Sequence, residues 1–163
     1  MHWQLIAEAL RLELAEYGEL LRLFELQQQS LFAREPDAVL QLGTQIEDQA
    51  RMLQDCRTRR EQAVATFAKR VGQPGTTTVR GLLEFVEVEA RPLLEALVNE
   101  INHLIHRVRR ASRQNHTLLA RTLEIHQETL RQLRPDSFTK TYSAVGRVSV
   151  AATQATPALR VAG

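Results

Sequence analysis

The feature that most constrains this chain is a heptad repeat between residues 97 and 129. Its positions alternate steps of four and three without a slip: Leu97, Ile101, Leu104, Val108, Ala111, Asn115, Leu118, Thr122, Ile125 and Thr129. Such a repeat is typical of a long helix that packs against other helices along its length. A helix from Pro92 to Leu133 would be about 60 Å long at ~1.5 Å per residue, so it needs long partners. The repeat loses apolar character after Ala111, which predicts weaker packing in its second half.

Two earlier stretches supply helical stripes of comparable length. The first, over residues 2–34, carries Trp3, Ile6, Leu10, Leu14, Tyr17, Leu21, Phe24 and Leu31. The second, over residues 36–71, carries Val39, Leu42, Ile46, Ala50, Leu53, Cys56, Val64, Phe67 and Val71. This spacing places the apolar residues on one side of each helix. Further leucines widen the first stripe, and a second copy, a short third helix or a binding partner could cover them: Leu12, Leu20, Leu23 and Leu26.

Proline and glycine separate these stretches. Arg34-Glu35-Pro36-Asp37 ends one helix and starts the next, because proline fits the first turn of a helix. Gly72 is a natural helix stop. The hydroxyls of Thr76–Thr78 could cap a short third helix over about 78–90. Pro92 either kinks that helix or begins a new one, and we favour a new one because the residue before proline avoids helical angles.

These patterns predict an all-α fold, an elongated antiparallel bundle of three long helices plus one short helix. Arg134-Pro135-Asp136 ends the last helix, and no useful helical stripe follows it. We therefore predict a helical bundle domain over residues 1–135 and a flexible C-terminal tail over residues 136–163. The tail keeps Phe138 and Tyr142, so it either orders on a partner or retains unused hydrophobicity.

Composition narrows the class of protein further. The chain has 163 residues and one cysteine, Cys56, which excludes an intramolecular disulfide and indicates a reducing compartment. The first residues lack the basic start and apolar run of a signal peptide. No stretch approaches the roughly 18 apolar residues that span a bilayer. We expect a cytoplasmic protein without stable membrane insertion.

The charges are unevenly distributed along the chain. The formal net charge is only +2, too small to require a polyanionic partner. The first thirty-five residues are acidic, whereas Arg107, Arg109, Arg110 and Arg113 make the last helix basic. We expect these two helices to lie side by side and offset each other's charge. A helical coiled-coil adaptor or a nucleic-acid-associated regulatory protein is the alternative interpretation.

The search for catalytic chemistry finds only weak candidates. Glu100 and His103 have the Glu-x-x-His spacing of di-iron bundles, but no second copy follows, and the inner stripes of the first two helices carry no acids. His103 and His106 share a helix face, a pair that is common on solvated surfaces. Cys56 lies on an apolar stripe, which favours packing over nucleophilic chemistry. We expect no enzyme activity, cofactor or metal, and a function in binding.

The chain resembles the FlgN family of flagellar export chaperones over most of its length. The resembling segments are Leu20-Leu21, Glu25, Leu31, Asp37, Leu40, Leu42, Arg60, Phe67-Ala68-Lys69-Arg70-Val71-Gly72, Ser112-Arg113-Gln114-Asn115-His116-Thr117-Leu118-Leu119 and Thr141-Tyr142-Ser143-Ala144-Val145-Gly146-Arg147. The last two are similar to the family's Asn-x-x-Asn-x-x-Leu-Leu and Tyr-Asp-Ala-x-Gly boxes. The sequence departs from the pattern at Ser112, Ser143 and Gln49, where the family usually has Asn, Asp and Lys.

The resemblance implies a cytoplasmic chaperone of the flagellar type III secretion system. Such a chaperone binds the first and third hook-associated proteins through their terminal helices, prevents their premature aggregation, and delivers them to the export gate. Carried onto this sequence, it implies a cargo-binding groove at Leu118, Leu119, Leu123, Leu130, Leu133 and Phe138. Related chaperones dock on the gate through a C-terminal tyrosine, which here is Tyr142. A homodimer is possible.

Overall fold

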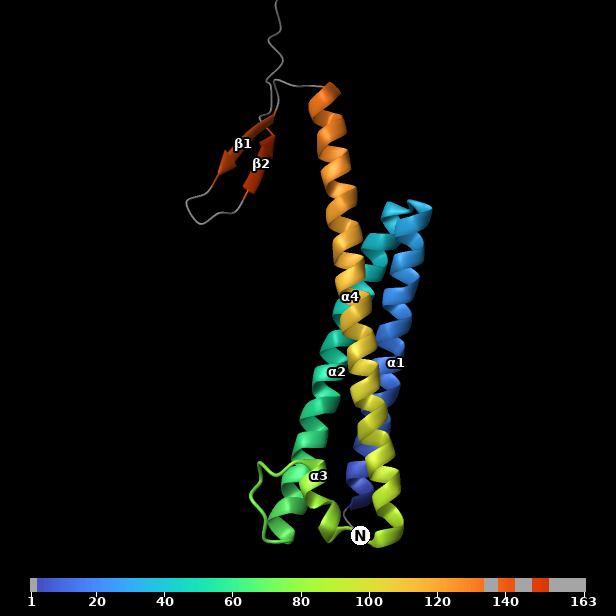
Figure 1. Ribbon diagram of the computed structural model, residues 1–163, viewed down its shortest axis with the longest axis vertical. Coiled ribbons are helices and arrows are strands. Elements are labelled where there is room, and N and C mark those ends of the chain that lie inside the picture. Colours follow the sequence, from blue (N-terminus) through green and yellow to red (C-terminus); the bar gives the residue numbers. More distant parts are fainter. Residues whose placement is uncertain (1–2, 134–137, 143–147, 153–163) are drawn as a thin grey trace, which may run out of the picture. The chain divides into compact units, whose positions relative to one another are not determined.

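The computed structural model describes residues 3–133, 138–142 and 148–152, with side chains up to residue 133. The chain divides into two compact units, Met1–Thr117 and Leu118–Gly163. The elements are α1 (Trp3–Ala33), α2 (Pro36–Arg70), α3 (Val79–Leu82), the 3₁₀ turns η1 (Leu83–Phe85) and η2 (Val88–Ala90), α4 (Arg91–Leu133), β1 (Phe138–Tyr142) and β2 (Val148–Ala152). The predicted all-α bundle of three long helices and one short helix is confirmed (Figure 1).

The turn between α1 and α2 shows why these two helices fold back on each other. Arg34 takes a left-handed conformation at φ 59°. Its N–H donates to the carbonyl of Leu31 at 3.3 Å, and the N–H of Glu35 donates to the carbonyl of Ser30 at 3.0 Å. This pair of hydrogen bonds satisfies carbonyls that a helix end leaves open. Pro36 then starts α2, as predicted.

The end of α2 uses the same pattern with a glycine in the left-handed position. Gly72 has φ 71°, and its N–H donates to the carbonyl of Lys69 at 3.3 Å. The N–H of Gln73 donates to the carbonyl of Ala68 at 2.8 Å. Glycine adopts this conformation without steric penalty, so the predicted stop at Gly72 is confirmed.

The connection to α4 is a short helix followed by two 3₁₀ turns. The Thr78 hydroxyl accepts a hydrogen bond from the N–H of Gly81 at 3.2 Å and so caps α3, one of the three predicted capping positions. The chain is extended at Val86, and Arg91 donates to the carbonyls of Val86 and Glu84, both at 3.0 Å. A new helix therefore begins at Arg91, which confirms that the short helix and α4 are separate.

The core of the first unit lies between α1, α2 and the first part of α4. In Figure 1 these helices run alongside one another, and α3 lies at the end where α1 begins. The largest fully buried apolar side chains come from α1, α3 and α4: Ile6, Leu10, Leu82 and Leu94. From α2 the core receives Leu53, Val64, Phe67 and Ala68. Cys56 is buried, as its place on the stripe predicts.

The second unit contains the end of α4 and a pair of antiparallel strands. In β1 and β2, Phe138 pairs with Ala152, Lys140 with Val150, and Tyr142 with Val148. The flexible tail predicted over residues 136–163 includes no such strands, so this pairing is a difference from the expectation. Residues 134–137 lie outside the described part of the chain, and the domain boundary after residue 135 stays a prediction.

Candidate binding surface

The end of α4 carries exposed apolar side chains, here called the distal face: Leu119, Leu123, Leu130 and Leu133 follow one side of the helix, and Ile125 lies on its heptad side. Their exposed fractions range from 38% at Leu119 to 73% at Leu133. Leu118, at the start of this stretch, is half-buried. Monomeric proteins seldom leave large apolar side chains gathered on one element without a binding role. The distal face is therefore the strongest candidate site in the second unit.

The heptad repeat continues to Thr129, but the residues at its positions are not buried after Asn115. Asn115 is the last buried residue of α4. Thr122, Ile125 and Thr129, which the repeat places on the inward side, are exposed. This corrects the expectation of weak but inward packing over the second half. The last buried contact of α4 within the first unit is the one that Asn115 makes with Gln27, and the residues from Leu118 onward belong to the second unit.

Threonines make this stretch of α4 more apolar than its sequence suggests. The hydroxyls of Thr117, Thr122 and Thr129 donate to the carbonyls four residues earlier at 3.0, 2.9 and 2.9 Å. Each hydroxyl is thus satisfied within the helix. What the Thr122 and Thr129 side chains add to their surroundings is mainly a methyl group. The face accordingly suits an apolar partner.

A buried polar contact marks the end of the core in the first unit. Asn115 is 2% exposed, and its Nδ2 donates to the carbonyl of Phe24 at 2.8 Å and to Oε1 of Gln27 at 3.1 Å. Gln27 in turn donates through Nε2 to the carbonyl of Val39 at 3.4 Å. Three helices are therefore joined at this level. The Asn-x-x-Leu-Leu box has a structural basis here, since its Asn side chain is buried in the core.

A second buried polar contact overturns the expectation that the inner stripes carry no acids. Glu13 of α1 is 0% exposed, and Arg60 of α2 donates from Nη1 to Glu13 Oε1 at 3.2 Å. Burial raises the pKa of Glu13, and the neighbouring Arg60 and Arg57 oppose part of that rise. Glu13 was missed because it lies one position before Leu14 on the predicted stripe. The sequence feature that could have indicated a buried acid is Arg60, which lies where the apolar stripe of α2 has few apolar residues.

The positive charge of the arginine-rich part of α4 is only slightly offset by acidic residues of α1. Arg107, Arg109, Arg110 and Arg113 are all exposed. Among the residues whose side chains are described, one ion pair joins the two helices, between Arg107 and Glu25 at 3.7 Å. The prediction that these helices lie side by side with opposite charge holds at this pair, and the other three arginines face solvent.

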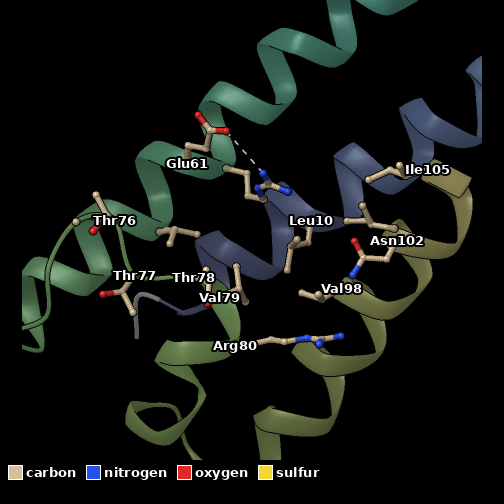
Figure 2. A pocket seen from close by; sticks show the side chains of 14 residues that line it. Leu10, Glu61, Thr76, Thr77, Thr78, Val79, Arg80, Val98, Asn102 and Ile105 are labelled. Carbon is tan, nitrogen blue, oxygen red and sulfur yellow. Dashed lines mark ion pairs between the residues drawn. The ribbon is translucent and has the colours of Figure 1, made fainter. Parts of the chain in front are cut away.

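A cleft of about 720 Å³ opens between α2, α4 and the loop before α3 (Figure 2). Leu10 lies at its centre in Figure 2, between Glu61 on one side and Asn102 on the other. Arg60, which lines it, is paired with Glu13, and Arg80 donates to Asn99 at 2.7 Å. The lining includes neither histidine nor cysteine, and Glu61 is its one carboxylate.

The other sequence candidates for chemistry lie on the exposed surface of α4. Glu100, His103 and His106 are exposed on α4. Within the described residues, no group of three or more His, Cys, Asp or Glu side chains is placed to hold a metal ion. No described helix is both long and apolar enough to cross a membrane.

The predicted site residues fall into two groups. Leu118, Leu119, Leu123, Leu130 and Leu133 lie together on α4. Phe138 and Tyr142 are the first and last residues of β1, and their side chains lie outside the described part. Ile125 was missed as a site residue, because the heptad repeat assigned it to internal packing. Only its exposure identifies it.

Comparison with known protein families gives one match. The model of the family described as FlgN protein matches residues 1–149, which include the whole helical part and most of the strand pair. A comparison with curated proteins found no match, and neither did one with solved structures.

Proposed function

Because the chain belongs to the FlgN family of flagellar export chaperones, we propose that it binds the first and third hook-associated proteins before export. In this proposal it covers an aggregation-prone terminal helix of each cargo and delivers the cargo to the export gate. Binding must precede secretion, so the chaperone acts in the cytoplasm. It performs no catalysis, and neither a cofactor nor a metal takes part.

The distal face is the observation that supports this proposal most. Leu119 and Leu123 are four residues apart, and Leu123 and Leu130 are seven apart, so all three lie on one side of the helix. An amphipathic helix binds such a row by placing its own apolar side chains against it. The cargo helix would thereby remove apolar surface of both proteins from water, which favours association.

The tail supplies the second part of the proposal. We assign Phe138 to the cargo site, because it follows the distal face closely in the sequence. Tyr142, the last residue of β1, is assigned to docking on the export gate. An isolated two-stranded hairpin is only marginally stable in water, so contact with a partner would help to hold it.

The test of cargo binding uses Leu123→Glu and Leu130→Glu in the full chain. A charge placed within an apolar contact should weaken binding of the hook-associated proteins by roughly tenfold or more. Isothermal titration calorimetry measures the affinity, and circular dichroism checks the fold. Leu40→Glu is the control, since Leu40 is a leucine on α2 that is even more exposed than Leu123 and Leu130. Unchanged binding by both distal variants, or an equal loss in the control, would contradict the proposed site.

The tail is tested separately from the distal face. A chain ending at Pro135 should bind cargo more weakly than the full chain if Phe138 contributes. Tyr142→Ala should bind cargo normally and fail to support export of the hook-associated proteins in cells. Normal export by Tyr142→Ala would remove the gate-docking assignment and leave cargo binding untouched.

A further inference from the structure

The middle of α4 is a long stretch without acidic side chains. Between Glu100 and Glu124 the sequence has no Asp or Glu, whereas it has five arginines and three histidines. Four of these arginines belong to the first unit, and all four are exposed: Arg107, Arg109, Arg110 and Arg113. Arg107 pairs with Glu25, but no described carboxylate forms an ion pair with the other three. This stretch therefore presents unbalanced positive charge to solvent.

The helix α2 adds a fourth unpaired arginine to the same surface. Arg57 is exposed, and it too forms no ion pair within the described part of the chain. Burial raises the pKa of Tyr17, and Arg57 of α2 and Arg109 of α4 both oppose this rise, so the two guanidinium groups lie near one phenol. Arg113 is four residues from Arg109 and three from Arg110, so it neighbours both on the helix surface. We call these residues the arginine face: Arg57, Arg109, Arg110 and Arg113.

The arginine face lacks the apolar anchors of a protein interface. Such interfaces are held by apolar and aromatic side chains at their centre. Among residues 91–117 of α4, no large apolar side chain is exposed, and the exposed neighbours of the arginines are polar, such as His106 and Gln114. The sequence of α4 also contains no Phe, Tyr or Trp, so it offers no aromatic ring on which the bases of a single-stranded nucleic acid could stack. The face offers charge alone.

We propose that the arginine face binds the surface of an anionic membrane through its phospholipid headgroups. A guanidinium group can donate two parallel hydrogen bonds to one phosphate group. A cluster of four basic side chains on a helical surface has the size that is typical of binding to anionic lipids, and such binding requires no apolar anchor. The contact is peripheral, and salt weakens it because exposed charges are screened within about 10 Å. It would hold the chain at the membrane whether or not cargo is bound.

Flotation of the full chain with phospholipid vesicles tests this proposal. The wild type should float with vesicles of equal parts phosphatidylglycerol and phosphatidylcholine at low ionic strength. It should stay in solution with pure phosphatidylcholine, and with the anionic vesicles once the salt reaches about 0.5 M. Arg113→Glu should weaken partitioning about tenfold or more, because it replaces an attraction with a repulsion. Arg113→Lys keeps the charge and should bind nearly as the wild type does.

Arg59→Glu is the matched control, since it makes the same change in net charge at an exposed arginine elsewhere on α2. Arg59 lines a groove between α1 and α2 to which no residue of α4 contributes, so this variant should float almost as the wild type does. Circular dichroism checks that each variant is folded. An equal loss in Arg59→Glu and Arg113→Glu would overturn the assignment to the arginine face.

Two further outcomes would overturn the proposal. One is a wild type that stays in solution with anionic vesicles at low salt, or that floats equally with neutral ones. The other is retention on a DNA duplex, lost in Arg113→Glu, without vesicle binding, which would assign the face to nucleic acid. No cargo is present in these assays, so their failure leaves the proposed function untouched.

Discussion

Two buried polar side chains, Asn115 and Glu13, fix how the helices of the first unit align. Each reaches across to another helix: Asn115 to Phe24 and Gln27, and Glu13 to Arg60. Sliding one helix along another would leave these groups buried without partners, which is costly. Their contribution is thus mainly to specify one alignment among several that leucines alone would allow.

Asn115→Ala should lower the free energy of unfolding by about 1–3 kcal/mol, because the backbone and side-chain acceptors that it serves would remain buried and unpaired. Urea denaturation measures this loss. Asn99→Ala is the control: Asn99 is exposed and accepts its bond from Arg80 at the surface, so its loss should stay within about 0.5 kcal/mol. Equal effects of the two substitutions would contradict the role given to Asn115.

Glu13 should make stability depend on pH in a particular direction. Burial raises the pKa of Glu13 in the folded state above its ordinary 4.5, so the folded protein binds this proton more tightly than the unfolded chain. The resulting stabilisation is complete below pH 4.5 and is lost as the pH rises through the higher folded pKa. Glu13→Gln removes the titration.

The free energy of unfolding of the wild type, relative to that of Glu13→Gln, should therefore fall as the pH rises through that window. Urea denaturation at several pH values measures the difference. A wild type that gains stability relative to Glu13→Gln over the same window would refute a raised pKa.

At the scale of elements, helix ends were the most predictable part of the molecule. Pro36 starts α2, Gly72 follows its end and Thr78 caps α3, each at the position expected from the sequence. Each residue meets a local requirement of the backbone at a helix end. The strands β1 and β2 were not predicted, although Thr, Tyr and Val favour strands. Helical spacing is the pattern that dominates this chain, and the pairing of two five-residue runs depends on contacts that spacing does not report.

Gly72→Ala should destabilise the end of α2 by roughly 1–2 kcal/mol, since a side chain at φ 71° is strained. Gly18→Ala provides the opposite control. Gly18 lies inside α1, and a Cβ there would meet no atom within 4 Å. Alanine at this position should raise stability by about 0.5–1 kcal/mol. Thermal and urea denaturation should thus shift in opposite directions, and a shift in the same direction would contradict this account.

At the scale of the whole chain, the sequence predicts the bundle well and its binding surface only in part. A heptad repeat identifies a side of a helix, but it does not report whether another helix packs against that side at every level. Ile125 shows the consequence: its spacing matches that of Val108, yet Val108 is buried and Ile125 is 66% exposed. Family resemblance led to the neighbouring leucines, and exposure in the structure added Ile125.

Hydrogen exchange should separate the two parts of α4 in the free protein. Amides of Leu97, Ile101 and Leu104 lie in the core and should exchange slowly. Amides of residues 119–132 belong to a stretch with exposed side chains and should exchange faster, because few contacts oppose local opening. Adding a hook-associated protein should slow the second group alone. Equal protection of both groups without cargo would contradict an unpartnered distal face.

The threonines of α4 bear on how selective this chaperone can be. The hydroxyls of Thr122 and Thr129 already donate to the carbonyls of Leu118 and Ile125. A bound ligand without a hydrogen-bond acceptor therefore leaves neither hydroxyl unpaired. Sites discriminate strongly only when a wrong ligand strands a polar group, while carbon surfaces distinguish ligands weakly. Under the proposed function, one such tolerant strip could accommodate two cargoes of unlike sequence, and telling them apart would fall to the tail or to the secretion machinery.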